Sequence, residues 1–325
     1  MAKHPQLSVI IPFLNEIESL PELYPWIVRT LEKAALSFEL ILIDDGSTDS
    51  SWSWVEEIAE KDKRVFGIRF LRNYGKSQAL HAGFLQCNGD VVCTMDADLQ
   101  DSPEELPDLY RLITDDDYDM VSGWKKKRYD SILFKNTPSK IFNWAARRVS
   151  GIKLHDFNCG LKAYRSDLVK TIEVYGEMHR YIPLLAKQAG FIRIGEKVVR
   201  HQARKFGHSK FGPERFVKGF LDLITLWFLH RFGRRPMYIF GLIGSIMLLL
   251  GFSFAIYLGF DKLFVNPSGR LIADRPQFYV ALTTMILGSQ FFLAGFIGEI
   301  IVRNRDHKLR YKIKETISPN SNGNT

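Results

Sequence analysis

Two long apolar stretches near the C-terminus constrain the fold of this chain more than any other feature. Residues 238–260 carry no charged side chain, and residues 277–301 carry a single acid, Glu299. At the rise of an α-helix the first stretch spans roughly 34 Å, enough to cross a hydrocarbon core of about 30 Å. A buried pair of core helices is the alternative, but it would need a far larger soluble domain to cover it. The sequence therefore predicts two transmembrane helices.

Basic residues around these stretches predict their orientation. Arginines and lysines flank the pair on both outer sides, at Arg231, Arg234 and Arg235 and at Arg303, Arg305, Lys308, Arg310, Lys312 and Lys314. The connection 261–276 holds fewer, and two acids oppose them. Because basic flanks stay in the cytoplasm, both termini are expected there, in a multi-pass membrane protein. The net charge of +8 fits contact with anionic membrane lipids, so no nucleic-acid partner is required.

The first two hundred or so residues alternate between strand and helix patterns. Apolar runs predict strands at residues 7–13, 38–45, 64–71, 90–98 and 118–124. Segments of helical period separate the first four runs and lead into the fifth. Because the runs are continuously apolar, both faces of each strand are expected to be covered, which is typical of an α/β domain with a mostly parallel sheet. Ligands of such sheets bind beyond the carboxyl ends of the strands.

Acidic residues follow three of the predicted strands. Glu16 comes just after the first, and the second and fourth run into their acids, Asp45 and the pair Asp96 and Asp98. One acidic strand end is ordinary, since aspartate forms turns and caps helices, but three at one edge are harder to explain as caps. In extended geometry Asp96 and Asp98 point the same way and can share a divalent ion with the amide oxygen of Gln100. The pattern predicts Mg²⁺ or Mn²⁺, with positions left for substrate phosphates.

Residue spacing excludes three rival ligand motifs. An EF-hand beginning at Asp96 would require glycine where Asp101 stands and glutamate where Pro107 stands. The letters GKS at residues 75–77 fail as a phosphate-binding loop because its first glycine would fall at Phe70. No two glycines lie one residue apart, which excludes the dinucleotide fingerprint.

Six motifs carry a family resemblance when taken together and in order: VIIPFLNE, LILIDDGSTDSS, LRNYGKSQAL, DADLQDSPEE, DFNCGLKAYR and HQARKFGHSKFG. With the two predicted spans, they resemble the family 2 glycosyltransferases of the dolichyl-phosphate mannose synthase and bacterial polyprenyl-phosphate glycosyltransferase group. The resemblance covers nearly the whole chain. It implies a nucleotide-sugar-binding GT-A fold, Mg²⁺ or Mn²⁺, and inverting transfer of a sugar to a membrane polyprenyl phosphate, as in the synthesis of cell-envelope glycans.

The resemblance also implies which residues meet the donor. The implied donor contacts are Pro12, Glu16, Ile43, Asp45, Asp96, Ala97, Asp98, Lys125, Arg204 and Lys210, and the implied metal ligands are Asp96, Asp98 and Gln100. Arg204 and Lys210 are implied on the donor diphosphate, which arginine can hold in bidentate fashion. Anionic lipid headgroups are the alternative partner of this basic stretch. Leu14 stands where many relatives carry an aromatic residue, which leaves the nucleobase open.

Acceptor and catalytic roles are implied for a smaller group. Lys125 stands where relatives commonly carry an arginine, and Lys125 or Arg128 is expected at the acceptor phosphate. Asp156 is a candidate for orienting the acceptor or for a weak base, and equally for a turn residue. A lipid phosphate has its second pKa near 6 and needs no strong base, so the metal and Arg204 are expected to stabilise the leaving nucleoside diphosphate. The expected catalytic residues are Asp96, Asp98, Asp156 and Arg204.

These features predict four segments along the chain. They are a GT-A catalytic domain at 1–212, a juxtamembrane amphipathic helix at 213–236, a two-span hairpin at 237–303 and a cytoplasmic polar tail at 304–325. A soluble helix on the catalytic domain is the alternative for the second segment. A processive polysaccharide synthase should show a Q-x-x-R-W motif and more spans, and a catalytically silent adaptor should have lost its acidic strand ends. The sugar, the choice of a UDP- or GDP-sugar and the existence of a homo-oligomer stay open.

Overall fold

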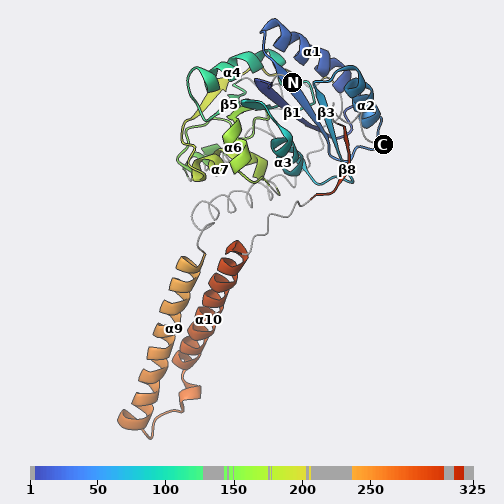
Figure 1. The fold of residues 1–325 in the computed structure, drawn as a ribbon. Coiled ribbons are helices and arrows are strands. Elements are labelled where there is room, and N and C mark those ends of the chain that lie inside the picture. The colour runs from blue at the N-terminus through green and yellow to red at the C-terminus, as the bar shows by residue number, and fades with distance from the viewer. Residues whose placement is uncertain are drawn as a thin grey trace. The chain divides into compact units, whose positions relative to one another are not determined.

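The structure, a computed structural model, describes residues 4–126, 143–144, 146–148, 150–174, 176, 178–202, 205, 236–303 and 311–317. The chain forms two compact units, one from Met1–Leu226 with Leu309–Thr325 and the other from Trp227–Lys308 (Figure 1). The predicted juxtamembrane helix at 213–236 lies outside the described residues except for Pro236.

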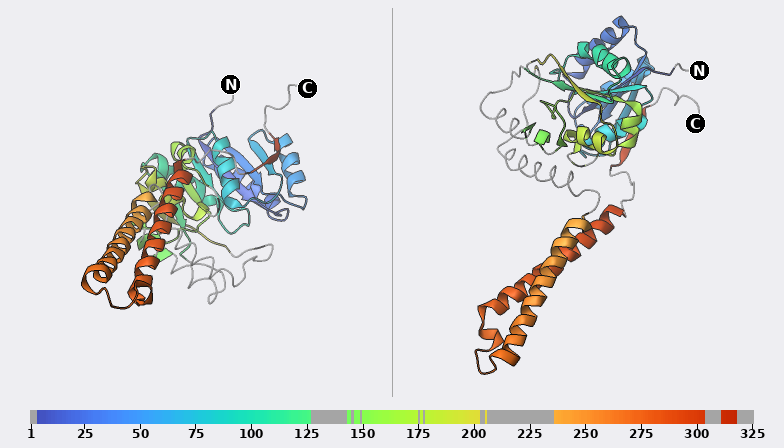
Figure 2. Two further views of the ribbon diagram at one scale, coloured as in Figure 1. Left: turned by 90° about the horizontal axis from the view of Figure 1, so that it is seen from below. Right: turned by 90° about the vertical axis from the view of Figure 1, so that its left-hand side faces the viewer.

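A sheet with helices packed around it forms the centre of the first unit (Figure 2). It has eight strands in the order β7-β5-β6-β4-β1-β2-β3-β8. Its strands are β1 (Leu7–Phe13), β2 (Phe38–Asp44), β3 (Val65–Phe70), β4 (Val91–Thr94), β5 (Met120–Trp124), β6 (Lys162–Arg165), β7 (Ile194–Val198) and β8 (Ile313–Ile317). Strands β1 to β4 pair in parallel, as do β5 and β7, whereas β6 and β8 run antiparallel to their neighbours. The predicted mostly parallel α/β sheet is therefore confirmed.

The observed strands differ from the predicted ones in two respects. β4 ends at Thr94, well before the predicted end at Asp98, so the acidic segment that follows is loop. The strands β6, β7 and β8 were not predicted from the sequence. β8 lies within the segment 304–325 that was expected to be a polar tail, and it pairs with β3 at the edge of the sheet.

Helices cover both faces of the sheet. The helices α1 (Leu20–Lys33), α2 (Ser51–Lys61) and α4 (Leu106–Thr114) share one core with alternate residues of β1, among them Val9 and Ile11. The intervening Ile10 faces α3 (Lys76–Gln86), where it lies against Gly83. The buried residues of α1 recur every three or four positions, so one side of this helix meets the sheet. Strands buried on both faces explain the continuous apolar runs in the sequence.

The remaining helices of this unit are short. The helices α6 (Ser166–Thr171) and α7 (Ile182–Gln188) and the 3₁₀ turns at Pro103–Glu105 and Met178–Arg180 follow the sheet strands and connect them. Helix α6 packs against α3, on the face of the sheet opposite α1.

The second unit contains a helical hairpin, α9 (Met237–Phe260) and α10 (Pro276–Arg303). Two helices here are long and apolar enough to cross a membrane, and they match both predicted spans. Their backbones approach closely at Gly244, where an added Cβ would lie 2.6 Å from the carbonyl oxygen of Gly288. Small residues at such a contact are how helices pack together in lipid. At the turn of the hairpin Arg275 forms an ion pair of 2.5 Å with Asp261.

Candidate active site

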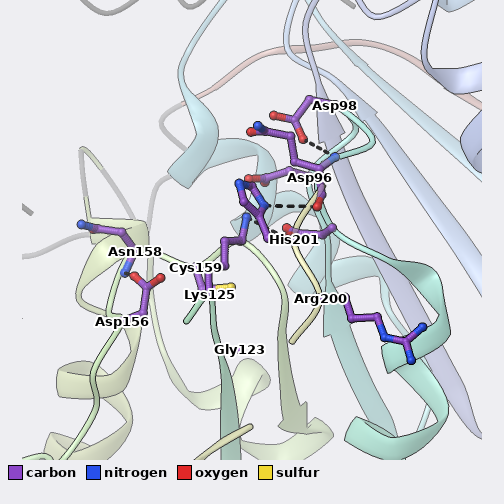
Figure 3. Close-up of polar contacts among 12 residues, drawn as sticks. Asp96, Asp98, Gly123, Lys125, Asp156, Asn158, Cys159, Arg200 and His201 are labelled. Carbon is purple, nitrogen blue, oxygen red and sulfur yellow. Dashed lines mark hydrogen bonds and ion pairs between the residues drawn. The ribbon is translucent and has the colours of Figure 1, made fainter. Parts of the chain in front are cut away.

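One edge of the sheet gathers nearly all the predicted site residues that the structure describes. The parallel strands β1, β2, β4 and β5 all end there, and the antiparallel β6 begins there, as the pairing of Thr94 with Lys162 indicates. The loops at this edge therefore include residues 14–16, 45–48, 71–76, 95–101, 125–126 and 156–161. Figure 3 shows the part of the edge around Asp96.

The carboxylate of Asp45 at the end of β2 is buried and binds two backbone amides. Its Oδ1 accepts a hydrogen bond of 2.7 Å from the Tyr74 N–H, and its Oδ2 accepts one of 3.0 Å from the Gly75 N–H. Burial raises the pKa of Asp45 to about 6. The hydrogen bonds from the two amides act against this rise, whereas the negative charge of Asp44 adds to it. Asp45 thus ties the end of β2 to the loop after β3.

Glu16 lies on a loop that is fastened to the same turn. The Asn15 N–H donates to the Ser47 hydroxyl at 2.9 Å, and the Thr48 N–H donates back to the Asn15 side chain at 2.8 Å. The Ser19 hydroxyl donates to the Glu16 carboxylate at 2.6 Å. The turn after β2 is therefore hydrogen-bonded to the loop after β1 that carries Glu16.

Pro12 and Ile43 are paired neighbours in β1 and β2. Pro12 is partly exposed, whereas the Ile43 side chain is fully buried and lies against Gly83 of α3. Both residues thus lie in the strands that lead to the Asp45 turn, but the Ile43 side chain belongs to the core.

Asp96 lies just beyond β4 between a lysine and a glycine. Its carboxylate forms an ion pair with Lys76 from the start of α3. Burial alone would raise the pKa of Asp96, but the charges of Lys76 and Lys125 outweigh burial and lower the pKa to about 2. A Cβ at Gly160 would lie 2.4 Å from Oδ2 of Asp96, so only glycine fits against this carboxylate. The site therefore holds Asp96 ionised and in a fixed position.

The segment from Asp98 to Gln100 is a tight turn and not an extended strand. Leu99 has a φ of 59°, in the left-handed region, and Oδ1 of Asp98 accepts a hydrogen bond of 3.2 Å from the Gln100 N–H. The expectation that Asp96 and Asp98 point the same way because they sit on one strand is therefore wrong in its geometric basis. Both side chains still lie at the same edge, with the buried Ala97 between them (Figure 3).

Lys125, which follows β5, contacts the carboxylate of Asp101, a residue that was not among the predicted site residues. Its Nζ lies 2.6 Å from Oδ1 of Asp101, and both side chains are largely shielded from solvent (Figure 3). Burial lowers the pKa of Lys125, but the carboxylate of Asp101 reverses this effect and leaves the pKa above its ordinary value. Burial raises the pKa of Asp101, against the opposing charge of Lys125. Arg128, the other predicted acceptor contact, lies outside the described residues.

Asp156 is buried in the loop that precedes β6. Its Oδ1 accepts a hydrogen bond of 3.1 Å from the Asn158 N–H, and its backbone carbonyl accepts one of 3.2 Å from the Ser122 hydroxyl. The turn role expected for Asp156 is thus present. In Figure 3 Asp156 and Asn158 lie beyond Lys125 and Cys159 as seen from Asp96. The same loop therefore contributes both Asp156 and the glycine against Asp96.

The interior of this loop is lined by Cys159 and Lys162. Burial raises the pKa of the Cys159 thiol to about 12, so the thiol is neutral at physiological pH. Lys162 is buried and donates to the Cys159 carbonyl, and its burial lowers the pKa of its ammonium group. Neither side chain is placed as a nucleophile, and Lys162 serves to hold the loop.

The basic motif that begins at residue 201 is described only in part. His201 is buried and its backbone forms a bridge with Asp101, while Arg200 is exposed and pairs with Glu104 at 3.4 Å. Figure 3 shows the Arg200 side chain pointing away from Asp96. Arg204 and Lys210 lie outside the described residues, so their predicted contacts stay predictions.

Four site residues were missed by sequence reasoning: Lys76, Asp101, Gly160 and Lys162. Each belongs to a quoted motif; Lys76 directly follows Gly75, and Asp101 directly follows Gln100. Charge balance could have pointed to the two lysines, because several carboxylates at one buried edge require nearby cations.

The donor set of Asp96, Asp98 and Gln100 suits a divalent cation. Two carboxylates and an amide oxygen are hard ligands of the kind that Mg²⁺ and Mn²⁺ prefer. In the described ranges, no group of three or more His, Cys, Asp or Glu side chains gathers closely enough to hold a metal alone. Such a set fits an ion that takes its remaining ligands from a substrate. Lys76 keeps Asp96 in the charged form that this role requires.

Two solved structures share the fold of the first unit. Glucosyl-3-phosphoglycerate synthase from Mycobacterium tuberculosis in complex with phosphoglyceric acid aligns with a TM-score of 0.51 and 20% identity, over 70% of this chain and 80% of that chain. The same enzyme in complex with Mn²⁺ and UDP-glucose aligns with a TM-score of 0.51 and 21% identity, over 70% and 79% of the two chains. At this identity the likeness concerns the fold alone, which is a GT-A-like α/β fold.

Sequence comparisons extend the likeness beyond the first unit. Dodecaprenyl-phosphate galacturonate synthase of Rhizobium johnstonii is 35% identical over 302 residues, 92% of this chain and 88% of that protein. Undecaprenyl-phosphate 4-deoxy-4-formamido-L-arabinose transferase of Salmonella choleraesuis is 35% identical over 321 residues, 97% of this chain and 95% of that protein. The pattern of Glycosyl transferase family 2 matches residues 8–173. The resemblance inferred from the motifs is thus confirmed, and the chain belongs to glycosyl transferase family 2.

Proposed function

We propose that this protein transfers a sugar, with inversion, from a nucleotide-sugar to the phosphate of a membrane polyprenyl phosphate. The observation that carries the proposal is the occurrence of an acidic strand edge and a membrane-length hairpin in one chain. Relatives that match over almost the whole chain are named for undecaprenyl and dodecaprenyl phosphates. A soluble acceptor would not require the hairpin.

The donor is expected at the ends of β1, β2 and β4. Glu16 and Asp45 are proposed to hold the nucleoside, with Pro12 and Ile43 in the adjoining strands. A fold relative carries UDP-glucose and Mn²⁺ together, which supports a nucleotide-sugar donor and a divalent metal here. Asp96, Asp98 and Gln100 would hold that metal, and when bound it supplies positive charge to the departing diphosphate. Arg204 and Lys210 are proposed to contact the same diphosphate.

The acceptor phosphate is expected between Lys125 and the loop of Asp156. A lipid phosphate with a second pKa near 6 is largely dianionic at neutral pH, so it can attack the sugar without a general base. Lys125 keeps its proton because of Asp101 and supplies a cation on this side of the edge. Asp156 lies in a turn that fixes its direction, which suits an orienting role better than proton transfer. Arg128 is proposed as a further contact of the acceptor phosphate.

A turnover assay tests this function directly. The full chain in lipid nanodiscs is incubated with a panel of UDP- and GDP-sugars, a polyprenyl phosphate and Mg²⁺ or Mn²⁺. We expect release of a nucleoside diphosphate and a glycolipid that is joined through a phosphodiester and labile to mild acid. Transfer to a hydroxyl group, with the polyprenyl phosphate left unchanged, would contradict the proposal.

The hairpin is proposed to cross the membrane twice, with the catalytic unit and both termini in the cytoplasm. β7 precedes the hairpin and β8 follows it in one and the same sheet, so both of its ends lead back to a single unit. The basic residues on the outer flanks favour the cytoplasmic side for that unit.

A labelling experiment tests this topology. A cysteine at the exposed Ser268, in a background without Cys87, Cys93 and Cys159, should react with an impermeant thiol reagent added outside intact cells. A cysteine placed in the tail beyond β8 should stay protected. The reverse pattern of labelling would overturn the proposed orientation.

A further inference from the structure

The strand that follows the membrane hairpin lies beside the loop that binds Asp45. β8 pairs antiparallel with β3, and Arg69 of β3 stands opposite Glu315 of β8. Just beyond β3, the Leu71 N–H donates to the Lys312 carbonyl at 3.0 Å. The loop that starts at Leu71 supplies the two amides that bind Asp45. The last described segment of the chain therefore supports one wall of the proposed donor site.

A line of charged side chains leads from β8 to the end of β2. Arg69 Nη1 lies 3.8 Å from the Glu315 carboxylate, and Arg69 Nε lies 3.4 Å from Oδ2 of Asp44. The Asp44 side chain is fully buried, and its Oδ2 makes no hydrogen bond within the described part of the chain. Because a buried carboxylate needs a compensating charge, the position of Arg69 matters for the residue directly before Asp45. Glu315 is one of the groups that fix this guanidinium.

A line of aromatic rings leads to the same place. Tyr311, which is buried, stacks on Phe70 with ring centroids 4.7 Å apart and an interplanar angle of 26°. Phe70 in turn meets the Tyr74 ring edge-on at 5.7 Å. Tyr74 is the residue whose N–H donates to Asp45 at 2.7 Å. Removal of the Tyr311 ring would leave a space beside Phe70, the ring that the Tyr74 side chain contacts.

The turn after β2 has little room to adapt to such a change. Gly46 has a φ of 82°, and an added Cβ would lie 2.5 Å from the carbonyl carbon of Arg72. The backbone of the turn thus rests on the backbone of the loop after β3. A shift of that loop must move Asp45 as well.

We propose that β8 and Tyr311 position the donor pocket, so that the C-terminal segment sets donor affinity without touching the donor. The inference rests on the proposed function, because it assumes that Asp45 faces the nucleotide. The simpler alternative is that β8 only covers an open sheet edge. In that case its loss lowers the stability of the unit and leaves nucleotide affinity unchanged in the protein that stays folded.

Two truncations separate these alternatives. The full chain in nanodiscs is compared with a chain ending at Arg310, which lacks Tyr311 and β8, and with a control ending at Ile317, which keeps both. The affinities for UDP and GDP with Mg²⁺ are measured by calorimetry, and the KM values for donor and polyprenyl phosphate by turnover. We expect the shorter chain to lose nucleotide affinity by about tenfold, equal to about 1.4 kcal/mol, and to raise the donor KM with the lipid KM unchanged. The control should match the full chain.

Point variants decide the question if the shorter chain does not fold. Tyr311→Ala should weaken nucleotide binding, whereas Tyr311→Phe should keep it, because the ring stack is retained. Glu315→Gln should weaken binding to a smaller degree than Tyr311→Ala, with exposed Lys314→Gln as its matched control. Folded Tyr311→Ala protein with unchanged nucleotide affinity would overturn the inference. A wild-type protein that binds neither UDP nor GDP would instead overturn the proposed donor and leave the β8 packing intact.

Discussion

The acidic ends of β2 and β4 lie at one edge of one sheet, yet the pKa values of their carboxylates are shifted in opposite directions. Asp45 after β2 is buried against backbone amides, and its pKa is raised to about 6. Asp96 after β4 is surrounded by lysines that overcome its burial, and its pKa is lowered to about 2. Amides provide hydrogen bonds without a full charge, whereas lysines provide both. The surroundings of the β4 end therefore favour an ionised carboxylate, as the proposed metal role requires, whereas those of the β2 end favour hydrogen bonds to backbone amides.

The largest expected effect comes from removing a carboxylate at the β4 end. Asp98→Ala should reduce turnover by about a thousandfold or more, because the divalent cation would lose an anionic ligand. EDTA should silence the wild type to the same degree. Turnover is measured with the donor identified in the panel assay, and exposed Asp116→Asn serves as the control. Full activity of the wild type in EDTA would show that the β4 end has no metal role.

The next largest effect comes from removing Lys125, whose positive charge compensates a buried carboxylate after β4. Lys125→Met should lower the free energy of unfolding by about 3 kcal/mol, because it leaves Asp101 buried without its partner. Chemical denaturation of the solubilised protein measures the loss. The double variant Lys125→Met, Asp101→Asn removes both charges and should regain most of the stability. A double variant as unstable as the single one would mean that Lys125 stabilises by packing and not by charge.

The difference between the two strand ends was only partly predictable from the sequence. The strands β1 to β5 were predictable because long apolar runs leave few other folds, and Asp45 and Asp96 were predictable as the residues that follow such runs. The pairing of Lys125 with Asp101 was not, because it joins residues on different loops through the tertiary fold. The turn at Leu99 was also hidden, since leucine rarely adopts a positive φ.

β8 shows most clearly why a local pattern has limits. Its five residues include three consecutive polar ones and show no alternation from which a strand could be predicted, and all but the last are exposed. In the sequence β8 follows the hairpin, whereas its partner β3 precedes the hairpin. Only the folded sheet reveals that the segment belongs to the first unit. The two helices of the hairpin were predictable, because their apolar stretches are long enough to cross a membrane.

The smallest expected effect tests the β2 end through its pH dependence. The pKa of Asp45 is raised in the folded state. Between about pH 4 and pH 6, folded Asp45 therefore keeps a proton that the unfolded chain has released. Ionisation of Asp45 lowers the stability of the fold as the pH rises through this window. Asp45→Asn cannot ionise and keeps an oxygen for the amides of Tyr74 and Gly75. The stability of Asp45→Asn relative to wild type should therefore increase by on the order of 2 kcal/mol between about pH 4 and pH 7. Unfolding curves at both pH values measure this change, and exposed Asp116→Asn should show none. If the relative stability of Asp45→Asn does not vary with pH, Asp45 titrates normally, and the two strand ends do not differ in the way their surroundings imply.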